Sequence, residues 1–277
     1  MLSINDHRRD SAGMRYIYPV VSRRAGGVSI GINLNVNNAC NWACIYCQVP
    51  ELKRGGPAKV DLHQLESELH DFLQEAIAGN FLKNNAPDGF QQLVDIAFSG
   101  NGEPTSAREF PEAVDVVGRQ LDGVGLLGRL KIRLITNGSL TRQTYVQKGV
   151  ARIGELGGEV WFKIDRGSSE EILRVNGTHT SPARIRKALL TCSGLAPTWV
   201  QTCLFSIDGL PLGEAEFMDY LELIASVASE IQGVHLYGLA RPSLQPDAKR
   251  LSALSAESLF SFADRIAALG IKVITSP

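Results

Sequence analysis

The chain has 277 residues, of which 44% are hydrophobic and 21% are charged, and its formal net charge at pH 7 is −1. This composition is typical of a globular protein with a substantial core, and the nearly balanced charge argues against a non-specific nucleic-acid-binding protein. No apolar run approaches the ~20 residues that cross a bilayer, and the N-terminal segment lacks the apolar stretch of a secretory signal. The sequence therefore predicts a cytoplasmic protein without a membrane partner.

Residues 1–27 are polar and contain two arginine pairs, Arg8-Arg9 and Arg23-Arg24, so they are interpreted as an N-terminal extension. After them, apolar β-branched runs alternate with stretches of helical periodicity, and no change in composition marks a boundary, so residues 28–277 are predicted to form one domain. The predicted strands are 28–36, 93–98, 131–135, 159–164, 199–207, 234–239 and 272–274. The predicted helices are 61–78, 112–121, 145–156, 182–190, 214–231 and 256–269. The segments predicted to be irregular are 51–59 and 79–89.

Strands that alternate with helices at this spacing indicate βαβ units and a parallel sheet. Right-handed crossovers can curl six such strands into an incomplete barrel with its helices outside. The predicted architecture is therefore an α/β fold, a partial (β/α)6 barrel. An open, doubly wound sheet is the alternative.

Three of the five cysteines, Cys40, Cys44 and Cys47, follow the first predicted strand with the spacing C-x3-C-x2-C. Cysteine thiolates are the usual ligands of iron–sulfur clusters, and three of them leave one iron of a cubane with a free coordination position. In zinc proteins, a metal that keeps a free coordination position is usually catalytic, and one with four protein ligands is usually structural. By analogy, the free position on this iron indicates a catalytic site. A zinc knuckle that lacks a ligand is the alternative interpretation. Cys192 and Cys203 are expected to be small buried apolar side chains, with a hydrogen-atom-donating thiol as the alternative.

Polar segments follow other predicted strands. Ligands of parallel α/β proteins bind at the carboxyl ends of strands, so these segments are candidate sites. After the second strand, two glycines permit close backbone approach and a glutamate adds a carboxylate. This segment consists of Gly100, Asn101, Gly102 and Glu103. After the third strand come Thr136 and Asn137, for which ligand binding and a simple turn are equal alternatives.

Lys163 and Asp165 close the fourth predicted strand. The alternation of a strand places both side chains on one face, which points inward in a barrel. Contact with a ligand is the preferred interpretation, and a buried salt bridge is the alternative. Gln201 lies in the fifth strand, and Arg241 follows the sixth, where its guanidinium is placed to meet a substrate anion.

The cysteine spacing with Tyr46 before the last cysteine, followed by FSGNGEPT, TNGS, WFKID, RVNG and YGLARP, resembles the radical S-adenosylmethionine (SAM) superfamily over roughly residues 28–265. Within the superfamily it is similar to the Fe–S oxidoreductase group related to the wyosine-base synthases. Those synthases carry additional N-terminal cysteines, whereas this chain has no cysteine before Cys40.

The resemblance implies a partial barrel of the radical SAM type, with one [4Fe-4S] cluster on Cys40, Cys44 and Cys47 and SAM on its free iron. It implies reductive cleavage of SAM to a 5′-deoxyadenosyl radical that abstracts a substrate hydrogen, with electrons from an external donor of the flavodoxin or ferredoxin type. Asn101 stands where the family most often has glycine, in a segment implied to hold the methionine amino group. The implied cofactor-binding residues are Tyr46, Gly100, Asn101, Gly102, Glu103, Thr136, Asn137, Lys163, Asp165, Gln201 and Arg241. No catalytic residue is assigned.

The sequence does not indicate the substrate or the oligomeric state. A small molecule, a peptide and RNA all remain open. Two groups of basic residues leave room for RNA, namely Lys53, Arg54 and Lys59, and Arg129, Lys131 and Arg133. The alternative function, from a different class, is a zinc-stabilised binding module without redox chemistry.

Overall fold

The computed structural model describes residues 2, 13–22 and 26–277, so the arginine pairs Arg8-Arg9 and Arg23-Arg24 lie outside the described residues. Its main sheet has eight strands in the order β1-β2-β5-β6-β7-β8-β10-β12. These are β1 (Ile17–Ser22), β2 (Gly27–Asn33), β5 (Leu93–Ser99), β6 (Lys131–Thr136), β7 (Glu159–Lys163), β8 (Thr198–Leu204), β10 (Val234–Gly238) and β12 (Val273–Ser276). β1 runs antiparallel to β2, and every other neighbouring pair is parallel.

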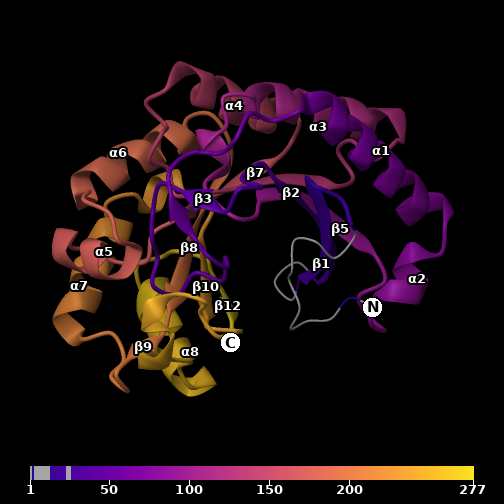
Figure 1. Cartoon of the computed structure of the whole chain (residues 1–277). Helices are drawn as coiled ribbons and strands as arrows, with labels where there is room; N and C mark the ends of the chain where they lie inside the picture. Colours follow the sequence, from indigo (N-terminus) through magenta and orange to yellow (C-terminus); the bar gives the residue numbers. More distant parts are fainter. Residues whose placement is uncertain (1, 3–12, 23–25) are drawn as a thin grey trace.

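The sheet is curled, and the helices form an arc around its outer side (Figure 1). They are α1 (Leu62–Ala78), α2 (Phe81–Asn85), α3 (Phe110–Gly123), α4 (Thr144–Glu155), α5 (Ser169–Asn176), α6 (Pro182–Ser193), α7 (Glu214–Ala225) and α8 (Ala256–Ala267). The short strands are β3 (Ala39–Cys40), β4 (Lys53–Arg54), β9 (Ser206–Ile207) and β11 (Leu251–Ser252). The predicted partial barrel, with six parallel strands from β2 to β10, is confirmed. In the described part of the chain, no helix is both long and apolar enough to cross a bilayer.

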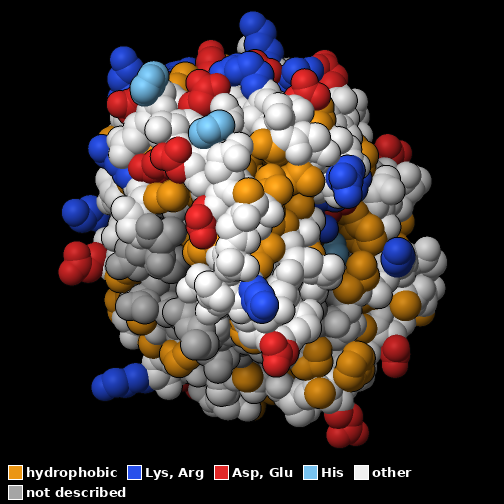
Figure 2. Space-filling model, turned by 90° about the vertical axis from the view of Figure 1, so that its right-hand side faces the viewer, with side chains coloured by type: hydrophobic (Ala, Val, Ile, Leu, Met, Phe, Trp, Pro, Cys, Tyr) orange, Lys and Arg blue, Asp and Glu red, His pale blue; other side chains and the backbone are white. Residues whose placement is uncertain are grey.

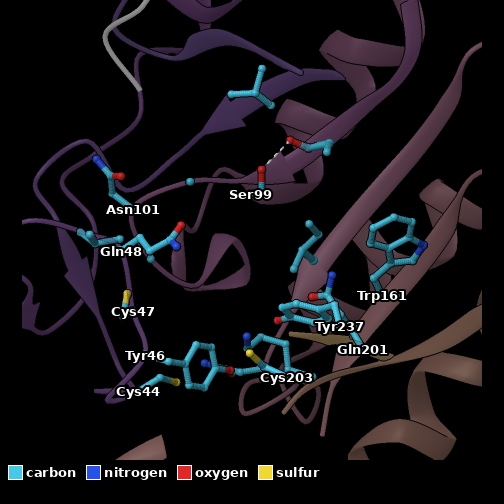
Figure 3. A pocket seen from close by; sticks show the side chains of 18 of the residues that line it. Cys44, Tyr46, Cys47, Gln48, Ser99, Asn101, Trp161, Gln201, Cys203 and Tyr237 are labelled. Carbon is cyan, nitrogen blue, oxygen red and sulfur yellow. Dashed lines mark hydrogen bonds between the residues drawn. The ribbon is translucent and has the colours of Figure 1, made fainter. Parts of the chain in front are cut away.

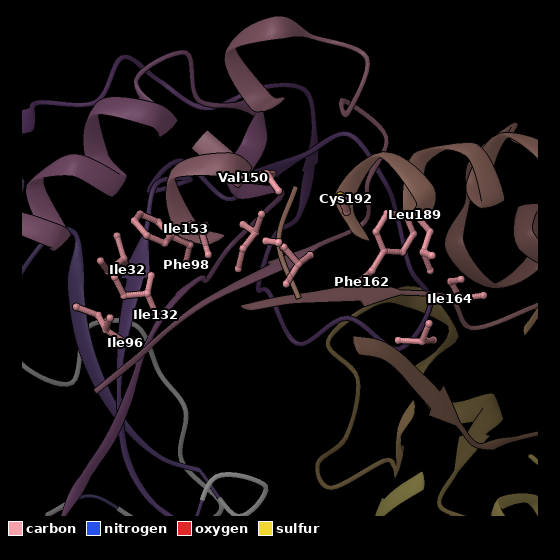
Figure 4. Close-up of a cluster of buried hydrophobic side chains, with 14 of the residues drawn as sticks. Ile32, Ile96, Phe98, Ile132, Val150, Ile153, Phe162, Ile164, Leu189 and Cys192 are labelled. Carbon is pink, nitrogen blue, oxygen red and sulfur yellow. The ribbon is translucent and has the colours of Figure 1, made fainter. Parts of the chain in front are cut away.

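The two faces of the curled sheet differ in chemistry because successive side chains of a strand point to opposite sides. Outward side chains such as Ile96, Phe98 and Phe162 are fully buried against the helices (Figure 4). Cys192 of α6 belongs to this core and is fully buried, as expected from the sequence. The inward side chains are smaller or more polar, and they include Ser29, Ala97, Ser99, Arg133, Lys163, Gln201 and Tyr237. The interior of the curl therefore has room for a ligand.

Two predicted boundaries were wrong. The segment 1–27, predicted to be an extension, contains β1, whose Ile17 and Val21 are fully buried in the sheet. Pro19 lies in β1, which stands at one end of the strand order of the described sheet, and proline within sheets is found mainly in such strands. The predicted helix 214–231 ends at Ala225, and the hydroxyl of Ser226 donates to Leu223 O at 2.7 Å, a local bond that competes with helix continuation.

Two helices were missed. α2 lies within the segment that was predicted to be a loop, and its five residues are too few to show a helical period. α5 is eight residues long and has the same difficulty, although its end signals are present in the sequence. The hydroxyl of Ser168 caps its first turn, and Gly177, with φ of +59°, ends it in the left-handed conformation. This helix matters for the site because its last turn contacts the cysteine loop.

Candidate functional site

A cavity of about 320 Å³ lies inside the curl of the sheet, where the parallel strands end (Figure 3). Its wall consists of inward strand side chains and of the loops after β2, β5, β6 and β10. It includes most of the sequence-predicted site residues, namely Cys40, Cys44, Tyr46, Cys47, Gly100, Asn101, Gly102, Glu103, Asn137, Lys163, Gln201 and Arg241. Two others, Thr136 and Asp165, are buried behind this wall. Figure 2 shows a hollowed face of the molecule with hydrophobic side chains around the hollow.

The cysteine loop, residues 39–48, is held by segments that are distant in sequence. The N–H of Ile45 donates to Val175 O in the last turn of α5 at 2.9 Å. From the other side, the hydroxyl of Ser243, in the loop after β10, donates to Ile45 O at 2.7 Å. Both bonds are made by the backbone of Ile45 with residues that are distant in sequence. The conformation of the cysteine loop therefore depends on how these segments pack more than on the neighbouring residues in the chain.

Two of the three thiols of this loop, those of Cys40 and Cys44, accept hydrogen bonds from N–H groups. The Trp42 N–H donates to Cys40 Sγ at 3.5 Å, and Asn176 Nδ2 donates to Cys44 Sγ at 3.3 Å. Burial raises the pKa of Cys40 to about 11 and that of Cys44 to about 12. Both groups are therefore protonated thiols at neutral pH, and a bound metal would displace their protons.

The donor set fits an iron–sulfur cluster. Thiolate sulfurs that accept N–H hydrogen bonds are a regular feature of such sites. Within residues 2, 13–22 and 26–277, no three Cys, His, Asp or Glu side chains are placed to hold one ion together. A cubane cluster carries each protein ligand on a different iron, so Cys40, Cys44 and Cys47 need not meet at one point.

The glycines after β5 permit close approach to protein atoms. A Cβ on Gly102 would overlap Ala39 O and lie 2.7 Å from Asn35 Nδ2, and Asn35 Nδ2 itself donates to Ala39 O at 3.0 Å. Gly100, with φ of +125°, lies against the side chain of Asn33 in the same way. These glycines therefore pack the loop after β5 against the end of β2 and the cysteine loop.

We expect Gly102→Ala to lower the free energy of unfolding by ~1–3 kcal/mol, because backbone atoms must move to admit the methyl group. Denaturant unfolding measures this value. Gly123→Ala, at the end of α3 with open space around it, is the matched control and should be neutral or slightly stabilising. Equal unfolding midpoints for both variants would contradict the tight packing at Gly102.

Glu103 joins the loops that follow β5 and β6. Its Oε1 accepts from the N–H and hydroxyl of Thr105 (3.1 and 2.6 Å) and from the hydroxyl of Thr136 (2.6 Å). Its Oε2 accepts from the Asn137 N–H at 2.7 Å. Burial raises the pKa of Glu103 above its usual value, although these hydrogen bonds act in the opposite direction. With four donors around it, the carboxylate is better placed to position Asn137 than to contact a ligand directly.

Asp165 is also occupied by protein groups. Its Oδ2 accepts from the Tyr46 hydroxyl at 2.5 Å and from Asn176 Nδ2 at 2.8 Å, and its Oδ1 accepts from the Cys203 N–H at 2.9 Å. Its hydrogen bonds therefore fix the cysteine loop, α5 and β8 relative to one another. The ligand contact that was predicted for Asp165 is replaced by this positioning role.

Lys163 and Gln201 are opposite each other on β7 and β8, and both line the cavity. The Lys163 Nζ lies 4.9 Å from the centroid of the Tyr46 ring. Burial lowers the pKa of Lys163, whereas the nearby acidic groups of Tyr237 and Asp165 raise it by more than burial lowers it. The pKa of Lys163 therefore lies above its usual value, and the side chain is a cation. Gln201 is buried, and its Nε2 has no hydrogen-bond partner among the described residues.

Arg241 lies at the cavity, as predicted, and Gln48 holds it there. The Arg241 Nε donates to Gln48 Oε1 at 2.9 Å, and Gln48 Nε2 donates back to Arg241 O at 3.1 Å. Gln48 directly follows Cys47, so this reciprocal pair connects the cysteine loop to the loop after β10. Gln48 was not predicted as a site residue, although its place beside a ligand cysteine was a usable signal.

Two of the basic residues considered for RNA donate hydrogen bonds to backbone carbonyls of the protein. Arg54 donates to Asn41 O at 2.6 Å and to Gly177 O, so its guanidinium braces the cysteine loop. Lys131 donates to Gly157 O at 2.9 Å, at the amino end of β6 and away from the cysteine loop. These contacts weaken the sequence argument for RNA.

Arg133 points into the barrel, where it belongs to a charged cluster that sequence reasoning missed. It pairs with Asp95 and, at 2.8 Å, with Glu159. Its guanidinium lies 4.6 Å from the Trp161 ring centroid, and the Ser29 hydroxyl donates to Asp95. The usable signal was a charged residue between two apolar residues, Ile132 and Leu134, inside a predicted strand.

No known family model matches this chain. One curated relative, the GTPase Obg of Brachyspira hyodysenteriae, is 26% identical over 140 residues, which cover 50% of this chain and 18% of that protein. The chain thus spans less than a fifth of that relative, and the likeness does not indicate a shared family.

Solved structures are similar in fold. A radical SAM methyltransferase from Sphaerobacter thermophilus superposes with a TM-score of 0.61 at 15% identity, over 94% of this chain and 68% of that one. Streptococcus suis SuiB, bound to S-adenosylmethionine, gives 0.55 at 12% identity over 91% of this chain and 47% of SuiB. An anSMEcpe structure with bound AdoMet gives 0.54 at 16% identity, over 88% and 63% of the two chains. This chain therefore has the curled, mostly parallel half-barrel of radical SAM enzymes.

Proposed function

We propose that this protein is a radical SAM enzyme. The observation that carries the proposal is the position of Cys40, Cys44 and Cys47. The three thiols follow the first parallel strand of the half-barrel and line the same cavity as the loop of Gly100–Glu103. Ligands of parallel α/β folds bind at this end of the strands. When bound, a [4Fe-4S] cluster and SAM would supply one-electron cleavage of the sulfonium to methionine and a 5′-deoxyadenosyl radical that abstracts a substrate hydrogen.

The residues of this chain have separate tasks in the proposal. The three cysteines hold the cluster, and the backbone of Gly100 to Gly102 faces the methionine amino group. The Lys163 cation is placed to bind a carboxylate, and Gln201 and Asn137 offer amide groups in the same wall. Apolar side chains in the wall, among them Trp42, Tyr46 and Leu239, exclude water from the cavity. Glu103 in the wall, and Thr136 and Asp165 behind it, position these groups.

Within the superfamily, we place the chain beside the Fe–S oxidoreductases related to the wyosine-base synthases, on the motifs described above. The proposal includes an external electron donor of the flavodoxin or ferredoxin type and a cytoplasmic setting. The substrate class stays open among a small molecule, a peptide and RNA.

Anaerobic reconstitution tests the proposal. We expect about four irons and four sulfides per chain, the broad visible absorbance of a [4Fe-4S] cluster, and formation of methionine and 5′-deoxyadenosine once SAM and a reductant are added. A colourless protein that retains one zinc and leaves SAM intact would support the zinc-stabilised binding module instead. A cluster-loaded, reduced sample that fails to cleave SAM would also contradict the proposal.

A further inference from the structure

Asn176 is the last residue of α5, and its side chain is buried beside the cysteine loop. Its Nδ2 donates to Cys44 Sγ at 3.3 Å and to Asp165 Oδ2 at 2.8 Å. Asp165 also accepts from the Tyr46 hydroxyl and the Cys203 N–H, so the amide group of Asn176 that faces this acceptor is assigned as the nitrogen and not the oxygen. The two protons of this nitrogen are thereby assigned, one to the carboxylate and one to the sulfur.

The backbone imposes this geometry. The Ala43 N–H donates to Asn176 O at 3.0 Å. Gly177 lies so close to this loop that a Cβ on it would be 2.8 Å from Ala43 O. The guanidinium of Arg54 donates to Asn41 O in the cysteine loop and to Gly177 O directly after α5. The end of α5 and the cysteine loop therefore form one fixed unit, and the amide of Asn176 is directed at Cys44 in advance of any ligand.

We propose that Asn176 is a positioning residue that orients Cys44 and raises the reduction potential of the cluster bound by Cys40, Cys44 and Cys47. The inference rests on the proposed function. An N–H bond to a ligating sulfur stabilises the reduced cluster more than the oxidised one, because reduction increases the negative charge on the sulfurs. The buried, low-dielectric surroundings strengthen this effect. In the step concerned, one electron passes from the external donor to the cluster, and Asn176 neither gains nor loses a proton.

Two variants remove the N–H bond in different ways. Asn176→Leu keeps the branched four-atom side chain, at a larger volume, without any donor. Asn176→Asp keeps the shape but replaces the amide with a carboxyl group that faces the sulfur and Asp165. Asn85→Leu is the matched control, because Asn85 lies in α2, away from the cysteine loop, and its Nδ2 donates to Phe81 O of its own helix.

The experiment is an anaerobic potentiometric titration of the reconstituted proteins without SAM, followed by electron paramagnetic resonance of the reduced cluster. We expect the midpoint potential of Asn176→Leu to lie ~59 mV below that of the wild type. For a one-electron couple, this shift corresponds to a tenfold change in the equilibrium constant for reduction. The midpoint potential of Asn176→Asp should also fall, since a carboxyl group that shares a proton with Asp165 has no further proton to donate to the sulfur. Asn85→Leu should match the wild type.

Iron and sulfide counts separate the two levels of the proposal. A wild type without an iron–sulfur cluster would refute the proposed function, and this inference with it. Equal cluster content with unchanged or higher potentials in both Asn176 variants would overturn the inference alone. Loss of the cluster in both Asn176 variants, while Asn85→Leu retains it, would also overturn the tuning role, since Asn176 would then be required for ligation.

Discussion

Replacing Cys44 with serine is expected to abolish cluster binding and to lower SAM cleavage by more than ~100-fold. This exceeds the ~10–100-fold cost of losing a residue that only orients a metal ligand. Serine preserves the size of the side chain but supplies a hard oxygen in place of the soft sulfur that iron–sulfur clusters require. Iron and sulfide content after anaerobic reconstitution, together with the rate of 5′-deoxyadenosine formation, measures the effect.

Cys192→Ala is the control for this experiment. Cys192 is fully buried in the core between the sheet and α6, away from the cavity, so its loss should cost only stability. The control should bind as much iron as the wild type. Full iron content in Cys44→Ser would contradict the assignment of Cys44 as a ligand, and a colourless Cys192→Ala would point to a general loss of fold.

Glu103→Gln is expected to change how stability depends on pH. Burial raises the pKa of Glu103 in the folded state above its value in the unfolded chain. Above the unfolded-state pKa, the unfolded chain releases the proton first, so the native state binds more protons and wild-type stability falls as pH rises through the folded-state pKa. Below the unfolded-state pKa, the carboxyl is neutral in both states and this loss is absent. Glutamine does not titrate, and the variant should lack this contribution.

Urea unfolding of both proteins at a series of pH values from 4 upward tests this prediction. The free-energy difference between wild type and variant should favour the wild type most at the acidic end. At every pH the variant also loses stability, by ~1–3 kcal/mol, because an amide N–H must face one of the donors that now surround the carboxylate. Thr105→Val separates the two effects, since it removes one hydroxyl donor and leaves the titrating group in place. A pH-independent difference would contradict the raised pKa.

Local patterns in the sequence were sufficient to predict the main strands and helices, because each strand or long helix shows its period within its own residues. The alternation of these elements predicted a parallel sheet, and it left both a partial barrel and an open, doubly wound sheet as alternatives. β1 and α5 were not predicted from the sequence, for two different reasons. β1 is stabilised by pairing with β2, and α5 is shorter than the window in which a helical period can be recognised.

The sequence by itself determined the cysteine loop and the glycine loop of the candidate site, since their residues are adjacent in the chain and their spacing is directly readable. Only the tertiary structure decided what surrounds them. Asn176 donates a hydrogen bond to Cys44, which is 132 residues away in the sequence, and Arg241 donates one to Gln48, which is 193 residues away. It also divided the predicted site residues into those that line the cavity, such as Lys163 and Glu103, and those that are buried behind its wall, such as Thr136 and Asp165. A side chain's partners depend on contacts between distant segments, and neither its identity nor its local spacing contains that information.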